Sequence, residues 1–351
     1  MTVRIQKPAF NIREKLSELE RPIGLKGFEL MRAETAQEAR DFVSAGRKNL
    51  IINGDMRIAQ RGTSSTIDNN YGTVDRWFKY ASGDTNTWGQ AVDPVHGYYA
   101  YWKANSSGYG NLRQRIEGFH IPTQGITVTL SFWMKIDSGE APLRIEVWNL
   151  TDSNNILSDL NIDTLTSSWK YYTITFNILS NVSLDTFHIM IGSNSAPAGT
   201  TFYLTKVQLE VGKNATEFEH RSYGEELALC QRYYERWTGV GSSVWYTGHG
   251  YGPQIYVVLP YKVTKRTSPN EVGASVEYST TDANALFSAY GNTSFSADIG
   301  ALMTSTPIVT SSTNTDLSFY IQLSASTYTP YGTAVLWAVK NGEWIAINSE
   351  L

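Results

Sequence analysis

The sequence predicts a mainly β protein: a short N-terminal helical segment, an antiparallel jelly-roll-like β-sandwich, a linking helix and a C-terminal β-sandwich tip. Three observations support this fold class. The 351 residues suffice for two to three domains. Runs of β-branched and aromatic residues, separated by Gly, Asn, Ser and Pro, fill most of the chain after residue 48. Residues 1–48 differ sharply in composition, which places a boundary there.

The N-terminal segment, residues 1–48, is charged and predicted to be helical. It holds 10 of the Lys and Arg residues and 7 of the Asp and Glu residues, whereas all 10 Trp and 21 Tyr follow it. Ile12, Leu16 and Leu19 are four and three residues apart, which makes an apolar stripe along one helix face. Two interpretations remain open. The segment is a helical hairpin of one chain, or partner chains cover the stripe, because so short a helix is marginal alone.

The first β domain is predicted to span residues 49–217 and to be a sandwich of jelly-roll size. Residues 126–136 alternate cleanly, with Val128, Leu130 and Phe132 on one face and Ser131 and Trp133 on the other. The stretch from 88 to 109 is rich in Gly, Asn and Ser and is expected to form loops. The predicted strands are 50–54, 126–136, 143–150, 169–178, 186–192 and 201–211.

The second half of the chain is predicted to begin with a linking helix, residues 218–239. Ser222 is a good N-cap residue, and residues 223–237 lack the alternation of a strand. Leu227, Cys230 and Tyr234 have the spacing of a seam between packed helices. Residues 240–351 return to β-branched and aromatic runs, which predict a C-terminal β tip domain.

Composition excludes several classes of protein. A single cysteine permits no internal disulfide and no cysteine-rich zinc site. A net charge of −4 and a pI near 5.8 argue against binding nucleic acid through its phosphates. Apolar runs are far shorter than the ~20 residues that span a bilayer, and the first residues lack the apolar core of a secretory signal.

Catalytic and metal-binding patterns are also missing. The five histidines lack the spacing of a metal site, and neither a nucleophile elbow nor a phosphate-binding loop is present. Carboxylates such as Glu117, Glu140 and Glu146 could in principle cleave a glycosidic bond, which needs two of them across a cleft. The periodic short strands of a long β-helix, the usual scaffold of tail-spike depolymerases, are absent. We therefore expect no metal, no cofactor and no enzymatic activity.

Two aromatic clusters are the informative feature. Rings beside adaptable Asn, Ser and Gly residues suit stacking on the apolar faces of sugars, a logic shared with antibody paratopes. A β domain also needs large side chains in its core, so core packing stays open for each ring. The glycan-binding candidates are Trp88, Tyr98, Trp102 and Tyr109 in the first cluster, and Trp245, Tyr246, His249 and Tyr251 in the second.

Residues 207–237 resemble a junction found in bacteriophage tail-fibre and receptor-binding proteins. In that group a strand ending in Q-L-E-x-G is followed by T-x-F-E-x-R and then by a helix with the sequence E-L-A-L-C-Q-R-Y-Y. The corresponding residues here are 208–212, 216–221 and 226–234. Residues 49–64 and the D-R-W sequence at 75–77 also resemble the start of the upstream domain in such fibres.

The first β domain is also similar to jelly-roll carbohydrate-binding modules. These often open with N-G-x-F-E and close with F-Y-x-D-D-V-x-L. In this chain Arg57, Thr205 and Lys206 stand where that family has acidic residues. The family's acids hold a structural calcium ion, which needs oxygen ligands, so no calcium is expected at this position.

The resemblance implies a homotrimer in the phage tail, made in the host cytoplasm and docked by its N-terminal segment to a tail or adaptor protein. It implies non-covalent attachment to a host-surface polysaccharide or lipopolysaccharide, with no nucleic acid bound and no membrane insertion. Two alternatives are a fibre-borne polysaccharide depolymerase and a purely structural tail or collar segment. The candidate trimer-seam residues are Ile12, Leu16, Leu19, Leu227, Cys230 and Tyr234.

Overall fold

The computed structural model of the chain describes residues 49–81, 87–104, 109–117, 126–149, 154–178, 187–238, 244–251, 254–267, 275–278, 287–291, 301–302, 308–312, 316–322, 332–338, 344–348 and 350. The N-terminal segment lies outside the described residues. The predictions made for Ile12, Leu16 and Leu19 therefore stay predictions.

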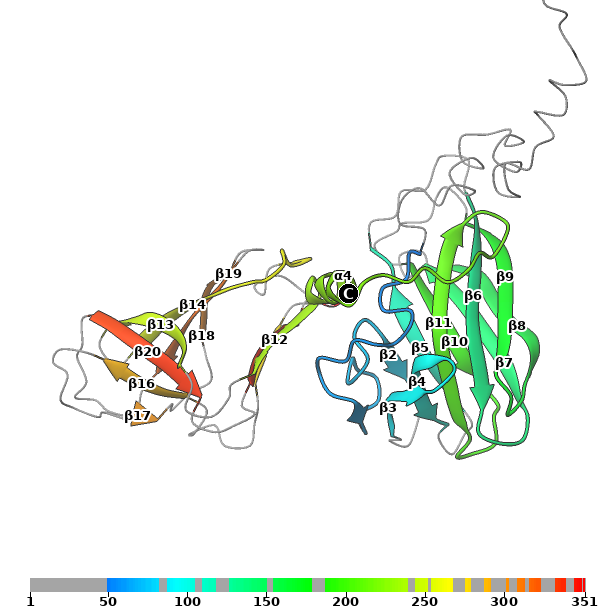
Figure 1. The fold of residues 1–351 in the computed structure, drawn as a ribbon, viewed down its shortest axis with the longest axis horizontal. Helices are drawn as coiled ribbons and strands as arrows, with labels where there is room; N and C mark the ends of the chain where they lie inside the picture. Colours follow the sequence, from blue (N-terminus) through cyan, green and yellow to red (C-terminus); the bar gives the residue numbers. More distant parts are fainter. Residues whose placement is uncertain are drawn as a thin grey trace, which may run out of the picture.

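The first β domain is a sandwich of two antiparallel sheets, as predicted (Figure 1). Sheet A consists, in spatial order, of β1 (Ser64–Ser65), β3 (Trp88–Asp93), β4 (Gly97–Lys103), β11 (Thr201–Val211), β6 (Ile126–Ile136) and β9 (Lys170–Ile178). Sheet B consists of β2 (Phe78–Tyr80), β5 (Gly110–Arg115), β10 (Phe187–Ser193), β7 (Ala141–Asn149) and β8 (Asn154–Leu165). From β4 to β11 the chain crosses between the sheets at every step except the β7–β8 hairpin, which is a jelly-roll pattern.

The core lies between the inner faces of the two sheets, and strand alternation explains which side chains enter it. In β6, Val128, Leu130 and Phe132 are fully buried, while Trp133 between two buried neighbours is only half-buried. The predicted strands 126–136 and 201–211 match β6 and β11 to the residue. Strands β7, β9 and β10 begin and end within two residues of their predicted bounds.

Two stretches of the sandwich differ from prediction. Residues 50–54 form bends and a turn in place of a strand, because Asn53 has a φ of 57°, in the left-handed region. The expected loop at 88–109 contains the β3–β4 hairpin, whose tight turn uses Gly97 with a φ of 78°. Gly97 marks the turn, while the aromatic residues Tyr98, Tyr99, Tyr101 and Trp102 that follow it belong to β4.

The linking helix α4 (Tyr223–Gln231) is shorter than predicted. It begins where Ser222 accepts a hydrogen bond from the backbone N–H of Glu225, as expected of an N-cap. It ends at Arg232, and the chain continues as β12 (Tyr234–Thr238). Aromatic residues favour a strand there, and β12 pairs along its whole length with β21 (Trp344–Asn348).

The C-terminal part, predicted as a sandwich, is described as one large and one small sheet. Sheet C holds β12, β21 and β15 (Ser275–Tyr278). In Figure 1, α4 lies between the sandwich and sheet D, and Glu350 near the end of the chain forms an ion pair with Arg76 of the sandwich. Sheet D consists, in order, of β17 (Ala301–Leu302), β16 (Phe287–Gly291), β20 (Gly332–Ala338), β13 (Val244–Tyr251), β14 (Gln254–Pro260), β19 (Asp316–Gln322) and β18 (Ile308–Ser312).

Candidate functional site

Aromatic side chains gather on the outer face of sheet A, the face turned away from the core. Trp133 points there because its neighbours Phe132 and Met134 point into the core. The strand register places Tyr171 of β9 opposite Trp133, and Tyr203 of β11 opposite Lys135. We call this surface the aromatic face and define it by His96, Tyr99, Trp133, Trp169, Tyr171 and Tyr203.

The rings of the aromatic face form one continuous chain of contacts. The centroid of Trp133 lies 5.5 Å from that of Tyr171 and 4.8 Å from that of His96. His96 is 4.9 Å from Trp169, which is in turn 6.0 Å from Tyr99. Tyr171 is 40% exposed, and the other five rings are half-buried. Apolar ring surface therefore reaches solvent across several strands of sheet A.

A turn between β3 and β4 fixes His96 on this surface. The carboxylate of Asp93 accepts hydrogen bonds from the backbone N–H groups of Val95 and His96, each at 2.8 Å. These hydrogen bonds lower the pKa of Asp93, the one from His96 most strongly. Partial burial lowers the pKa of His96, and Lys206 and Lys135 lower it further, against the opposing charge of Asp93. The ring of His96 is therefore neutral at pH 7.

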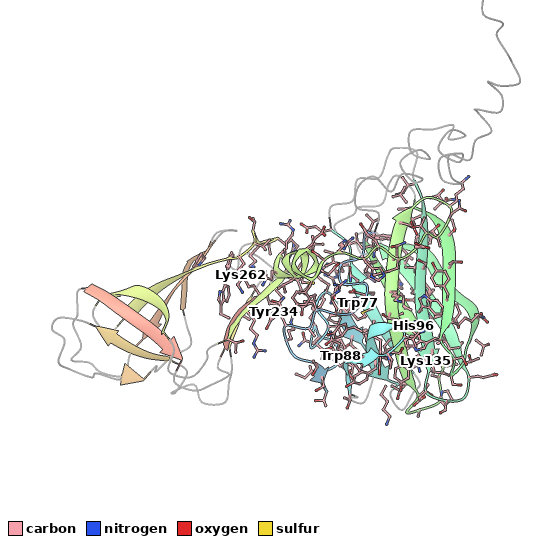
Figure 2. The ribbon with its side chains drawn as sticks, viewed as in Figure 1. Trp77, Trp88, His96, Lys135, Tyr234 and Lys262 are labelled. Carbon is pink, nitrogen blue, oxygen red and sulfur yellow. The ribbon has the colours of Figure 1, made fainter. Side chains whose placement is uncertain are left out.

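Lys135 completes the aromatic face with a positive charge. It lies two residues after Trp133 on β6 and so points to the same side of the sheet. Its ammonium nitrogen is 5.2 Å from the ring centroid of Trp169 and 5.1 Å from that of Tyr203, within cation–π range. Figure 2 shows Lys135 and His96 close to each other on the sandwich.

A cavity of about 510 Å³ adjoins the aromatic face. Trp133 and Tyr171 belong to both, and the segment after β11 supplies the far wall. Hydroxyl, imidazole, ammonium and carboxylate groups therefore stand beside exposed rings, the combination typical of a small-molecule site. The lining residues are Ser131, Trp133, Tyr171, Lys206, Ala215, Thr216, Glu217, Phe218 and His220.

The structure does not bring the first predicted aromatic cluster together on a surface. Trp88 and Trp102 are 0% exposed, so their prediction as glycan contacts is wrong. They face each other across β3 and β4 on the core side, where Trp102 stacks on Phe202 at 5.2 Å. Tyr98 is 44% exposed, and half-buried Tyr109 packs on a ring at the edge of sheet B.

The second predicted cluster falls on β13. Only the backbone of Trp245, Tyr246, His249 and Tyr251 is described, and their side chains lie outside the described residues. Their role in binding stays a prediction.

The predicted seam on α4 is corrected by the burial of its residues within one chain. Cys230 is 0% and Tyr234 is 1% exposed, so neither offers a surface to a partner chain, and Leu227 is half-buried. Because the chain leaves the helix before Tyr234, this ring packs on the sandwich, where the guanidinium of Arg61 lies 3.6 Å from its centroid. Burial raises the pKa of the Cys230 thiol well above its usual value.

The alternation of residues 126–136 predicted Trp133 on the face of β6 opposite to Val128, Leu130 and Phe132, but the rest of the aromatic face was not predicted. The signal was present in the strand alternation. Tyr171 precedes buried Tyr172, and Tyr203 lies between buried Phe202 and Leu204, so both had to point outward. The predicted clusters followed proximity in sequence, whereas the aromatic face gathers residues from four separate segments.

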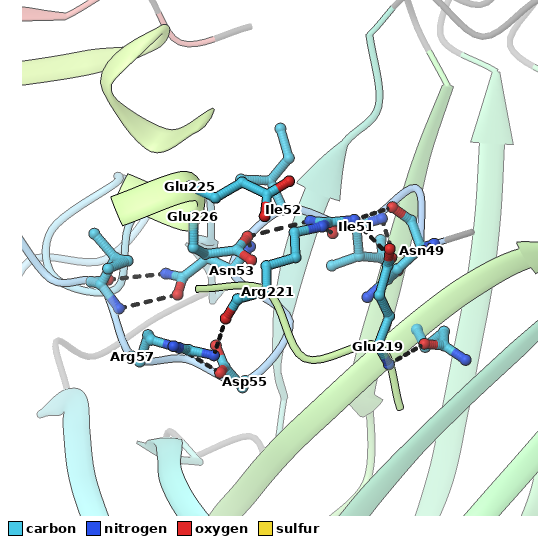
Figure 3. A network of polar contacts seen from close by, with 12 residues as sticks. Asn49, Ile51, Ile52, Asn53, Asp55, Arg57, Glu219, Arg221, Glu225 and Glu226 are labelled. Carbon is cyan, nitrogen blue, oxygen red and sulfur yellow. Dashed lines mark hydrogen bonds and ion pairs between the residues drawn. The ribbon is translucent and has the colours of Figure 1, made fainter. Parts of the chain in front are cut away.

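The segments that resemble phage fibres meet in a buried polar network (Figure 3). The guanidinium of Arg221 donates to the backbone carbonyl oxygens of Asn49 and Ile51 and pairs with Glu226 at 3.3 Å. Glu226 in turn accepts a hydrogen bond of 2.5 Å from the backbone N–H of Asn53. Burial raises the pKa of Glu226. This network joins the sandwich to α4, so these motif residues have a structural role.

Two further observations concern the described part of the chain. Within it, no three or more His, Cys, Asp or Glu side chains are grouped so that they could hold a metal ion. No helix within it has the length and apolar character needed to cross a membrane.

The sequence matches no protein-family model and no curated protein. Solved structures with a similar fold include a CBM4 carbohydrate-binding module, 19% identical, which covers 46% of this chain and 98% of its own, with a TM-score of 0.33. A CBM22 xylan-binding domain from Paenibacillus barcinonensis Xyn10C is 12% identical, with coverages of 49% and 100% and a TM-score of 0.33. The enzymatically active domain of bacteriophage CBA120 tailspike protein 4 is 12% identical, with coverages of 47% and 21% and a TM-score of 0.32.

An enzyme is matched at the same level. A cyclase from Fischerella sp. TAU is 16% identical, with coverages of 49% and 100% and a TM-score of 0.36. These identities and scores are too low to transfer a function, and one sandwich fold serves many functions. The function proposed below therefore rests on the residues of this chain.

Proposed function

We propose that this chain is a phage tail-fibre protein that attaches the virion to its host by binding a cell-surface glycan. The aromatic face with its adjoining cavity is the observation that carries this proposal. Pyranose rings present apolar C–H faces that stack on aromatic rings, while their hydroxyls need polar partners. Trp133 and Tyr171 supply the rings, and Ser131, Thr216 and His220 of the cavity wall supply polar groups. We propose recognition without bond cleavage, and therefore no enzymatic activity.

The fibre assignment is supported by the motif segments. Residues 49–53 and 219–226, which resemble phage fibres, form the network that fixes α4 to the sandwich. We propose that three chains assemble through the N-terminal segment. Three modest glycan sites on one particle would then bind together, because a second contact benefits from a high effective concentration.

The binding claim is tested with the purified full-length chain. We expect it to bind polysaccharide or lipopolysaccharide from a host strain and to block phage adsorption. Tyr171→Ala removes an exposed ring of the aromatic face, and Tyr223→Ala removes a ring that is 59% exposed on α4. Only the first variant should lose binding. If no glycan and no cell surface is bound, the chain is a structural segment, and if the polysaccharide is shortened, it is a depolymerase.

The trimer claim has a separate test. Light scattering of the full-length chain should give about three times the chain mass of 39.2 kDa. A mass near one chain would overturn the proposed trimer and leave the glycan-binding proposal standing.

A further inference from the structure

The side chain of Lys206 lines the cavity, and the backbone of this residue has an unusual conformation. A β-bulge interrupts β11 between Thr205 and Gln208, and Lys206 within it has a φ of 51°. This is the left-handed region, which residues other than glycine seldom occupy. A bulge re-aims a side chain away from the regular alternation of a strand, and strained backbone of this kind concentrates at functional sites. Here the re-aimed side chain lines the cavity beside Trp133 and Tyr171.

Two ammonium groups at this site have no carboxylate in ion-pair contact within the described part of the chain. They are those of Lys135, over two rings of the aromatic face, and Lys206 in the cavity wall. Lys170, on the same sheet, is paired with Asp163. Both Lys135 and Lys206 act electrostatically on His96, so the two charges surround the same part of the surface.

Two carboxylates, those of Asp93 and Glu217, lie near these ammonium groups, and within the described residues neither forms an ion pair with Lys135 or Lys206. One oxygen of Asp93 already accepts two hydrogen bonds from its own turn. Glu217 lines the cavity, where it is exposed to solvent. A ligand group that carries its own negative charge would gain a charge-assisted hydrogen bond from Lys206, which a neutral hydroxyl would not match.

We propose that the site selects acidic sugars: the ring of the sugar stacks along Trp133 and Tyr171, and its carboxylate binds Lys206 in the cavity. A uronic acid is the simplest residue of this class. The inference rests on the proposed glycan-binding function and adds the chemical class of the ligand. A charge-assisted hydrogen bond at a half-buried position corresponds to about a tenfold preference over the neutral sugar.

The test uses matched pairs of oligosaccharides that differ only in this charge. Uronic-acid oligomers are compared with the same oligomers after chemical reduction of each carboxylate to a primary alcohol, in calorimetric titrations of the full-length chain. The wild type should bind the acidic form about tenfold more tightly, and the preference should shrink as salt concentration rises. Lys206→Gln should remove the preference while weaker binding of the reduced form remains. Lys103→Gln, which removes an exposed charge at the far end of β4, should keep it.

The outcomes separate the inference from the proposed function. Equal binding of both forms by the wild type, or an unchanged preference in Lys206→Gln, would overturn the acidic-sugar inference while glycan binding stands. The inference would also be overturned if the chain bound host polysaccharide but neither oligomer, and if chemical reduction of the carboxylates in that polysaccharide did not weaken binding. If no glycan of any kind binds, the proposed function fails as well.

Discussion

Trp133 and Tyr171 stand directly opposite each other on strands β6 and β9, with ring centroids 5.5 Å apart and with Tyr171 40% exposed. The strand register sets this pair, since its immediate neighbours Phe132 and Tyr172 form the equivalent pair inside the core. The pair of Phe132 and Tyr172 therefore lies in the core, and the adjacent pair of Trp133 and Tyr171 lies on the surface. Function and stability can therefore be separated by substitution at adjacent positions.

Substitution of Trp133 tests the pair that lies on the surface. Trp133→Ala should weaken glycan binding at least tenfold, because it removes the ring shared by the aromatic face and the cavity. Its effect on unfolding should be smaller than that of a core substitution, because the ring is only half-buried. Titration with host polysaccharide and denaturant unfolding measure the two effects. If the affinity for host polysaccharide is unchanged, the aromatic face is not the glycan-binding site.

Substitution of Trp102 on β4 tests the core of the sandwich. Trp102→Ala should lower the free energy of unfolding by about 3–5 kcal/mol, because it leaves a cavity beside Phe202 in a fully buried site. Glycan affinity of the fraction that stays folded should not change. A variant with normal stability and lost binding would restore Trp102 as a glycan contact.

Removal of Arg221 tests the network that joins the sandwich to α4. Arg221→Met should lower the free energy of unfolding by about 3–5 kcal/mol, because it leaves the buried carboxylate of Glu226 without its cation. Lys170→Gln, which breaks an exposed ion pair with Asp163, serves as the control and should show no measurable change. Equal losses in the free energy of unfolding of the two variants would show that the buried network contributes no more to stability than an exposed ion pair.

His188 predicts how stability depends on pH. Burial, together with Arg113 and Arg115, lowers its pKa from 6.5 to about 4 in the folded chain. Between these values the unfolded chain binds a proton that the folded chain does not, so the part of the free energy of unfolding that depends on His188 falls as the pH falls from 6.5 to 4. Burial raises the pKa of Asp75 from 3.8 to about 6, and its contribution changes in the opposite direction over this range. The contribution of His188 is about 3 kcal/mol, and it levels off below pH 4.

The pH prediction is checked with denaturant unfolding between pH 7 and pH 4. On going from pH 7 to pH 4, the change in the free energy of unfolding should be less unfavourable in His188→Gln than in the wild type, by the contribution of His188, since a neutral side chain replaces the titrating ring. His220→Gln, at an exposed position, should leave the change as in the wild type. The same slope in wild type and His188→Gln would contradict the buried, neutral state of His188.

The sandwich was predictable from the sequence because runs of β-branched and aromatic residues alternate along the chain with turn-forming Gly, Asn, Ser and Pro. Two long strands were placed to the residue, since β6 and β11 are each a run of 11 residues rich in β-branched and aromatic side chains, flanked by turn-forming residues. The strand predicted at 50–54 failed because Asn49 and Asn53 use side-chain hydrogen bonds in place of a ladder. The end of α4 was missed because pairing of β12 with β21, more than a hundred residues later, overrides local helix propensity.

The candidate site was harder to predict than the fold. Trp88 and Trp102 are close in sequence to Tyr98, yet the two tryptophans belong to the core and only Tyr98 is exposed. The aromatic face forms only when β6, β9 and β11 pair in register, so no single segment displays it. The bulge that turns Lys206 into the cavity depends on that same pairing.

The most direct test is a crystal structure of the full-length chain with a bound oligosaccharide from the host surface. We expect a sugar ring stacked over Trp133 and Tyr171, with a polar or acidic group reaching into the cavity beside Lys206. A sugar bound only to the β13 region of sheet D, or to no part of the aromatic face, would contradict it.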